Sequence, residues 1–412
     1  MDTNDLYESV LDLKVPWSVY EVRPIYGSPK RTLSSVEVTI VHSEDYRCPE
    51  CGVSCSRHDS RTRRWRHLDT CNAHTILIAE VPRVRCKKHG VRQVAIPWSD
   101  GHAPYSIDFE CYAIDLLLET TVSGVARLLD MSWDAVRGIQ ERAVIRGLQR
   151  RAPLSPRHIG VDETSAKKHH RYVTIVSDQT TGLVLHVTEG KSSKSLENFY
   201  DSLSTKQLNA IESVSMDMSS AFISATQKSL AQSDTAICFD HFHVTAMFTG
   251  AVGTIRAREH KELMRDNIDI LKGTRFDWLC NDQEIDGRSR RWFHKLTVSA
   301  LHTARAWAIK EAATKCWQFC SAGWALRAWK KLLKWIDRCR IPEIKKLSST
   351  IKTHLWGILN AITHGVTNSP AEGINSRVQK TRAQACGFRS TKSFINSIYF
   401  RLGGLDLYPG VR

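Results

Sequence analysis

The chain has 412 residues, too many for one compact core, which predicts two to four domains. Its 58 basic and 43 acidic side chains give a formal net charge of +15, which favours a polyanionic partner, either nucleic acid or an anionic membrane. The sequence has no run of 18 apolar residues, so we expect no membrane-spanning helix. It begins with an acidic segment that lacks an apolar signal core, so we expect no secretion. We therefore predict that nucleic acid, rather than a membrane, is the partner.

Short strand-like pieces fill residues 1–45, and a cysteine pattern with metal-ligand spacing follows in residues 46–100. Two short ligand pairs (knuckles), at residues 48–51 and 86–89, are each followed by a glycine. Together they would supply four soft or borderline ligands, the set that a closed tetrahedral zinc site prefers. The predicted ligands of a structural Zn²⁺ are Cys48, Cys51, Cys86 and His89. Cys55 and Cys71 are spares, and either could replace an assigned ligand. Coincidental cysteines in a strand-rich domain are the alternative.

Arginines between the two knuckles would lie on a small rigid platform suited to phosphate contacts. The predicted DNA-binding residues of this stretch are Arg61, Arg63, Arg64 and Arg66. A solvated charged face is the alternative.

Residues 105–152 predict helices, and residues 121–136 fit a helix-turn-helix in which Ser132 caps the second helix. Val136 and Ile139 would pack inward. The residues left on the far side to face a DNA major groove would be Arg137, Gln140 and Arg142. Any three-helix bundle would show similar periodicity.

From residue 157 to 245 apolar strands alternate with helices, which predicts a mixed α/β sheet. The expected strands are 159–162, 172–177, 183–188, 214–216 and 236–240.

Three carboxylates follow or begin these elements. Asp162 and Asp217 each end an apolar strand, and Glu372 opens a helix. Such hard oxygen ligands suit Mg²⁺ or Mn²⁺, and two ions would activate a water or a 3′-hydroxyl for in-line displacement at phosphorus. Asp240 and His243 would support this site without being its ligands. Turn residues, helix caps and a hydrogen-bonded pair above the sheet are the ordinary alternatives.

Residues 246–360 are basic and helical, with tryptophans at near-helical spacing that would form a core or stack on an unpaired base. The candidate DNA-binding residues here are Lys330, Lys331 and Lys334. A second basic strip follows the glutamate in residues 361–412, with Arg377, Lys380 and Arg382.

Several motifs occur in an order that resembles one family. They are Cys48-Pro49-Glu50-Cys51-Gly52, Gly160-Val161-Asp162-Glu163, Met216-Asp217-Met218, Phe239-Asp240-His241-Phe242-His243 and Asn368-Ser369-Pro370-Ala371-Glu372-Gly373-Ile374-Asn375. The chain is similar over nearly its whole length to the IS-L-three group of bacterial insertion-sequence transposases. The combination is specific, although the second knuckle here is Cys86-x-x-His89 where Cys-x-x-Cys is more familiar.

This resemblance implies a DDE transposase with Asp162 on the first strand of its catalytic sheet, Asp217 on the fourth and Glu372 on a late helix. We therefore expect an α/β catalytic core with an RNase H-like mixed sheet (157–245 and 361–412) and a large all-helical insertion (246–360), preceded by a zinc-ribbon-like domain (46–100) and a helix-turn-helix domain (105–152). The expected partners are double-stranded DNA, as terminal inverted repeats and target, and further copies of the chain in a homodimer or higher oligomer. The expected location is the bacterial cytoplasm, at the nucleoid.

Two other functions fit parts of the sequence. A catalytically inactive regulator would use only the zinc and helix-turn-helix modules to bind DNA. An RNase H-like nuclease would cut DNA without strand transfer.

Overall fold

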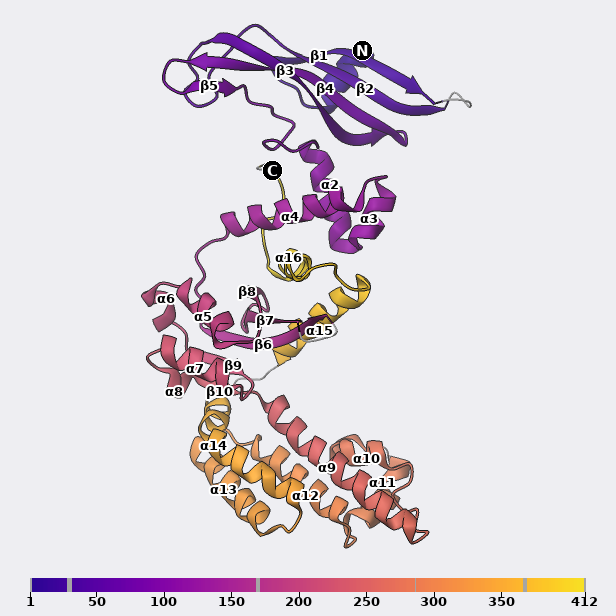
Figure 1. Cartoon of the computed structure of the whole chain (residues 1–412), viewed down its shortest axis with the longest axis vertical. Helices are drawn as coiled ribbons and strands as arrows, with labels where there is room; N and C mark the ends of the chain where they lie inside the picture. Colours follow the sequence, from indigo (N-terminus) through magenta and orange to yellow (C-terminus); the bar gives the residue numbers. More distant parts are fainter. Residues whose placement is uncertain (1, 28–31, 168–170, 286, 366–368, 411–412) are drawn as a thin grey trace. The chain divides into compact units, whose positions relative to one another are not determined.

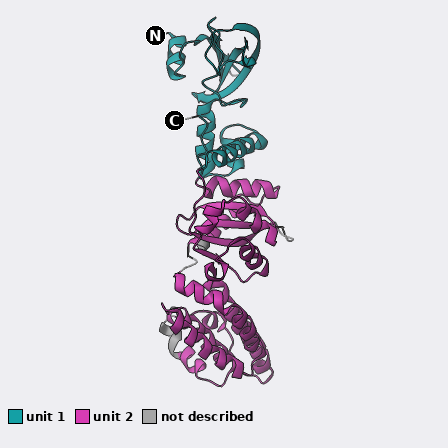
Figure 2. Ribbon diagram, turned by 90° about the vertical axis from the view of Figure 1, so that its left-hand side faces the viewer, with its two compact units in different colours: residues 1–151, 405–412 teal, residues 152–404 magenta. Residues whose placement is uncertain are grey.

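The computed structural model describes residues 2–27, 32–167, 171–285, 287–365 and 369–410. The chain divides into two compact units, residues 1–151 with 405–412 and residues 152–404 (Figure 2). The C-terminal residues 405–412 therefore belong with the N-terminal part, whereas the sequence pattern groups them with the rest of 361–412.

The first unit begins with a five-stranded sheet in the order β1-β2-β4-β3, with β5 paired to β4 (Figure 1). Its elements are α1 (Thr3–Val10), β1 (Trp17–Tyr26), β2 (Leu33–His42), β3 (Ser56–Thr70), β4 (Ala73–Cys86) and β5 (Gly90–Gln93). Alternate residues of β2 and β4, such as Val38 and Leu77, pack with Trp65 in a buried core, as the two-residue repeat of a strand requires. Because β2 pairs with β4, residues 1–45 and 46–100 share one sheet.

Three helices follow this sheet: α2 (Ile107–Glu119), α3 (Val122–Leu128) and α4 (Trp133–Arg150). Each begins at a hydroxyl cap, because Ser106, Thr121 and Ser132 accept a hydrogen bond from the backbone amide three residues later. The predicted cap at Ser132 is thereby confirmed. The helices pack through buried apolar residues that include Val125, Val136 and Ile139.

The second unit contains a mixed sheet with the strand order β10-β9-β6-β7-β8. The strands are β6 (His158–Lys167), β7 (Arg171–Asp178), β8 (Val184–Glu189), β9 (Ser213–Met216) and β10 (Ile237–Phe239). β7 pairs antiparallel with both β6 and β8. On the other side of β6, β9 pairs with β6 in parallel and β10 pairs with β9 in parallel. The helices between the strands are α5 (Ser193–Asp201), α6 (Thr205–Asn209), α7 (Ser220–Ser229) and α8 (Ser233–Ala236). The mixed sheet and the positions of the five predicted strands are confirmed. The prediction that Asp162 ends its strand is wrong, because β6 continues to Lys167 through its pairing with β7.

Helices occupy most of the chain after β10. They are α9 (His241–Arg265), α10 (Arg275–Leu279), the 3₁₀ turn η1 (Asp282–Glu284), α11 (Gly287–Thr297), α12 (His302–Cys316), α13 (Ala322–Arg338), α14 (Pro342–His364), α15 (Ser369–Gln384) and α16 (Thr391–Leu402). One apolar cluster, with Phe239, Trp278 and Trp329 among its largest members, joins the sheet to α9–α14. Within the described ranges, no helix is long and apolar enough to cross a membrane.

Candidate active site and nucleic-acid interfaces

The four predicted zinc ligands converge at one end of the first sheet. Their candidate ligand atoms all lie within 4.8 Å of one another. Cys48 Sγ is 3.5 Å from His89 Nδ1, and Cys86 Sγ is 3.8 Å from both Cys51 Sγ and His89 Nδ1. A tetrahedral zinc with ordinary Zn–S and Zn–N bonds would separate its ligands by about 3.5–3.8 Å. The donor set and its spacing therefore fit a closed zinc site.

The electrostatics of this cluster favour a metal-binding thiolate. Backbone amides of His89 and Lys88 lower the pKa of the Cys86 thiol to about 6. The spare cysteines are differently engaged: Cys55 Sγ lies 3.3 Å from the Val53 carbonyl oxygen, and Cys71 is exposed in the turn between β3 and β4. Neither belongs to the cluster of candidate ligands.

In the second unit, strand register aligns three carboxylates. Ser215 of β9 is opposite both Gly160 of β6 and Cys238 of β10. Asp162, Asp217 and Asp240 each lie two residues further along the chain, Asp162 within β6 and the other two just beyond β9 and β10, so they reach the same level of the sheet. Since neighbouring strands are about 4.8 Å apart, Asp217 lies between the other two.

Asp162 is half-buried, whereas Asp240 is buried. Burial raises the pKa of the Asp162 carboxyl, the neighbouring Asp217 raises it further, and the amide of Asn375 together with the Glu163 backbone N–H acts in the opposite direction. Asn375 Nδ2 donates to Asp162 Oδ2, and Gln379 donates to Thr164 Oγ1 at 2.7 Å. These two contacts hold α15 against β6.

The backbone of Glu372 lies in the first turn of α15, but its side chain is outside the described residues. Asn375 is three residues further on, and residues three apart share a helix face. The contact from Asn375 to Asp162 thus shows which face of α15 lies over the carboxylates.

Asp240 and His243 form a pair at the start of α9. Asp240 is buried and caps the helix, since its Oδ1 accepts the backbone N–H of Phe242 at 2.8 Å. Its Oδ2 lies 3.5 Å from His243 Nε2. On the other side, Asn360 of α14 donates to the Ile237 carbonyl at 2.9 Å, which fixes the strand that leads to Asp240.

Sequence reasoning missed two residues of this site. Asn375 was part of the family motif only, and its contact with Asp162 depends on how α15 packs. Glu163 lies near enough to Asp162 and Asp217 for both to raise its pKa, although burial raises it most and Lys191 lowers it. The sequence signals for Glu163 were its adjacency to Asp162 and its place in the motif Gly160-Val161-Asp162-Glu163.

Several of the side chains predicted to contact DNA are buried or paired within the three helices of the first unit. Gln140 is only 5% exposed, so the prediction that it faces outward is wrong. The reason is that the buried stripe of α4 is wide enough to include it beside Ile139 and Ala143. Arg142 is directed to the buried Glu110 of α2, with Nε 3.0 Å from its Oε1. Arg137 is half-buried and lies near Asp134 and Glu141.

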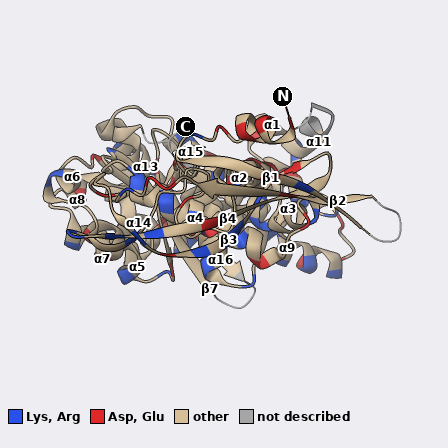
Figure 3. Cartoon of the chain, turned by 90° about the horizontal axis from the view of Figure 1, so that it is seen from above, with Lys and Arg blue, Asp and Glu red and all other residues tan. Residues whose placement is uncertain are grey.

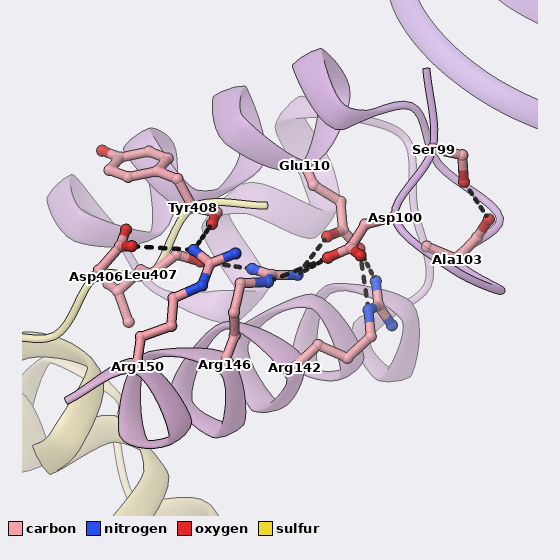
Figure 4. Close-up of polar contacts among 10 residues, drawn as sticks. All are labelled: Ser99, Asp100, Ala103, Glu110, Arg142, Arg146, Arg150, Asp406, Leu407 and Tyr408. Atoms are coloured by element: carbon pink, nitrogen blue, oxygen red, sulfur yellow. Dashed lines mark hydrogen bonds and ion pairs between the residues drawn. The ribbon is translucent and has the colours of Figure 1, made fainter. Parts of the chain in front are cut away.

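The C-terminal residues contact the next two turns of α4 (Figure 4). Arg146 donates to the Leu407 carbonyl at 2.5 Å and also lies 3.2 Å from both Asp100 and Glu110. Arg150 donates to the Tyr408 carbonyl at 2.7 Å. Arg142, Arg146 and Arg150 are spaced by four residues and face α2 and the C-terminal segment.

The arginines of β3 also differ in exposure. Arg61 is exposed, Arg64 is exposed and pairs with Glu37 at 2.5 Å, and Arg63 lies over the Trp65 ring. The side chain of Arg66 is only 12% exposed and pairs with Asp69 at 2.6 Å, so it serves the fold of the sheet.

Most of the predicted basic residues of the second unit are exposed, and Figure 3 colours the Lys and Arg positions along the ribbon. Lys330, Lys331 and Lys334 of α13 are exposed, as are Arg377 and Lys380 of α15. Arg382 is half-buried.

Comparison with known proteins agrees with this arrangement. The family model for the ISL3 (IS-L-three) DDE transposase, described as a transposase, matches residues 159–398, more than half of the chain. The zinc-finger of transposase IS204/IS1001/IS1096/IS1165 matches residues 45–89, and the helix-turn-helix domain of transposase family ISL3 matches residues 94–144.

Two curated relatives extend the likeness to most of the chain. A transposase for insertion sequence element IS1557 from Mycobacterium tuberculosis is 28% identical over 386 residues, covering 87% of this chain and 86% of the relative. A transposase for insertion sequence element IS1001 from Bordetella parapertussis is 24% identical over 357 residues, covering 85% and 87%. The chain therefore belongs to the ISL3 family of insertion-sequence transposases.

Proposed function

We propose that this member of the family is an active DDE transposase, which binds the terminal inverted repeats of an insertion sequence and catalyses strand cleavage and strand transfer into target DNA. The observation that carries the proposal is the shared level of Asp162 and Asp217 on neighbouring parallel strands, with the helix of Glu372 held against β6. That arrangement is suited to phosphoryl transfer with metal ions.

The proposed ligands of Mg²⁺ (or Mn²⁺) are Asp162, Asp217 and Glu372. Hard carboxylate oxygens are the ligands that these cations prefer. The raised pKa of Asp162 supports this assignment, because loss of solvent first and the neighbouring Asp217 second both disfavour its charge until a cation compensates it. When bound, two such ions would activate a water or a 3′-hydroxyl and offset charge at the scissile phosphate.

Other side chains would position this centre. Asn375 orients Asp162 through its amide, and Asp240 orients His243 at the N-terminus of α9. His243 is close enough to lower the pKa of Asp162, so we propose that its imidazole contacts a phosphate oxygen of the DNA.

We also propose roles for the remaining parts of the chain. The order β8-β7-β6-β9-β10, with the first strand central, is that expected of an RNase H-like core, and helices α9–α14 would be its insertion. The zinc cluster would stabilise the first unit. Duplex DNA would be bound by Arg137 of the helix-turn-helix and by the exposed arginines of β3. Assembly of two or more copies on DNA at the nucleoid in the bacterial cytoplasm completes the proposal.

The experiment is a cleavage and strand-transfer assay on DNA that carries both ends of the element, with Mg²⁺, Mn²⁺ or EDTA. Wild type is compared with Asp217→Asn and with Asp234→Asn, a matched change at an exposed carboxylate of α8. We expect Asp217→Asn to lose more than about 100-fold in cleavage, because loss of residues that merely support metal ligands already costs 10–100-fold. End binding should survive in both variants.

Each outcome assigns a function. Binding without cutting by wild type in Mg²⁺ and Mn²⁺ would make the chain a regulator. Cutting without joining would make it a nuclease. Cutting by Asp217→Asn at the wild-type rate would show that Asp217 is not a ligand of the catalytic metal.

A further inference from the structure

Helix α13 has a buried face and an exposed face with different chemistry. Its buried residues are Ala325, Trp329, Leu332, Leu333 and Ile336. The opposite side has a strip of exposed residues, which we call the α13 strip: Trp324, Arg327, Lys331, Lys334, Trp335 and Arg338. The helix is labelled in Figure 1. At 100° per residue, the basic members of the strip lie opposite the buried face.

The two tryptophans of the strip are not core residues. Trp324 is 61% exposed and Trp335 is 42% exposed, whereas Trp329 on the opposite side is fully buried. Eleven residues correspond to about three turns, so Trp324 and Trp335 lie on the same side of α13, roughly 16 Å apart along its axis. Both border the basic residues between them.

The positive charge of the strip is not compensated locally. Across the described ranges, no acidic side chain forms an ion pair with Arg327, Lys331 or Lys334. The one acidic residue of α13, Asp337, pairs instead with Lys352 of α14 at 2.8 Å. Arg327 lies 4.9 Å over the ring of Trp324, so that indole is already next to a cation.

Phosphate binding alone would explain the lysines but not the indole rings. Duplex DNA keeps the faces of its bases stacked inside the helix, so an exposed aromatic side chain can stack only on a base that is unpaired. A row of cations bordered by aromatic rings is the arrangement that binds single strands without reading sequence.

We propose that the α13 strip binds an unpaired stretch of DNA, with phosphates on Arg327, Lys331 and Lys334 and bases stacked on Trp324 and Trp335. This inference rests on the proposed function, because strand cleavage produces ends whose last nucleotides can separate from their complement. It assigns the aromatic residues that hold those nucleotides.

The test measures binding of fluorescent oligothymidine and of a blunt duplex of equal length by anisotropy, with the zinc-loaded chain in buffer free of Mg²⁺ and Mn²⁺ so that no strand is cut. Trp324→Ala and Trp335→Ala are compared with Trp292→Ala, which removes a 47% exposed tryptophan from α11. We expect each strip variant to bind oligothymidine about five-fold or more weakly, and the duplex and the Trp292→Ala variant to be unaffected. Trp324→Phe should retain most of the affinity, because it keeps an aromatic face.

Salt dependence separates the two kinds of contact. Lys331→Gln should reduce the slope of log affinity against log salt for oligothymidine by about 0.7, whereas Trp324→Ala should leave that slope unchanged. Equal losses on single strand and duplex, or no loss in either tryptophan variant, would overturn the inference.

The same measurement on Asp217→Asn distinguishes this inference from the proposed function. We expect that variant to bind oligothymidine like wild type while it cuts nothing. Normal cleavage by wild type, together with unchanged oligothymidine binding by both Trp324→Ala and Trp335→Ala, would refute the proposed role of the α13 strip and leave the transposase proposal standing. Strip-dependent binding in a wild type that never cuts would refute the transposase proposal alone.

Discussion

Replacing Gly147 with alanine tests how the C-terminal residues pack on α4. A methyl group at this position would lie 2.6 Å from Leu405 Cβ and 3.1 Å from the Asp406 carbonyl oxygen. Gly138→Ala is the matched control, because in the same helix its methyl group would meet only the end of the Arg142 side chain, at 3.5 Å.

Two effects of opposite sign compete at Gly147. Alanine in place of glycine inside a helix stabilises by roughly 0.5–1 kcal/mol. Forcing an extra methyl group into a packed contact costs about 1–3 kcal/mol, and the Leu405 backbone cannot yield without moving the segment that Arg146 and Arg150 hold. We therefore expect Gly138→Ala to stabilise the first unit and Gly147→Ala to destabilise it, with a difference of about 1–3 kcal/mol.

The assay is thermal unfolding of the zinc-loaded chain. The transition of the first unit is identified as the one that EDTA lowers. One kcal/mol moves the midpoint of a domain of this size by about 2–4 °C, so the two variants should be clearly separated. In a chain that ends at Gly404 both variants should stabilise. Equal stabilisation by both substitutions in the full chain would refute the packing of residues 405–410 on α4.

Three further results are expected. Cys51→Ser should lose bound zinc and lower the midpoint of the first unit, whereas Cys71→Ser should keep both, as measured by zinc content and calorimetry. Asn360→Ala should destabilise the second unit by about 1–3 kcal/mol in denaturant titration, because the Ile237 carbonyl loses its donor; an unchanged midpoint would contradict this. Burial lowers the pKa of His67 in the folded chain, so the unfolded chain binds its proton more tightly and stability should fall as pH decreases through about 6.5. That part of the pH dependence should disappear in His67→Gln, and an identical profile would show that His67 does not contribute.

The cysteine and histidine cluster and the mixed sheet could be predicted from the sequence because their signals are local or periodic. Knuckle spacing brings two ligands together in each half of the zinc site whatever the rest of the chain does. The apolar residues before Asp162 and Asp217 predict two strands that bring the carboxylates together, and the parallel register of β6 and β9 does so, although β6 continues past Asp162 to Lys167. The order of the quoted motifs along the chain then indicated the resemblance to one family.

Exposure of individual side chains depended on packing between distant segments, which no local pattern encodes. Gln140 is buried because it falls within the wide buried stripe of α4, and Arg142 is paired because α2 presents Glu110 to it. Arg146 meets Leu407, a residue 261 positions away in the sequence. Likewise, the sequence could not distinguish Trp329 in the core from the exposed Trp324, since both recur at helical spacing and only the direction of the α13 core separates them. The sequence alone therefore determined the modules, their order and the candidate ligands, whereas the tertiary structure decided which polar side chains remain available to DNA, because availability is set by what each helix packs against.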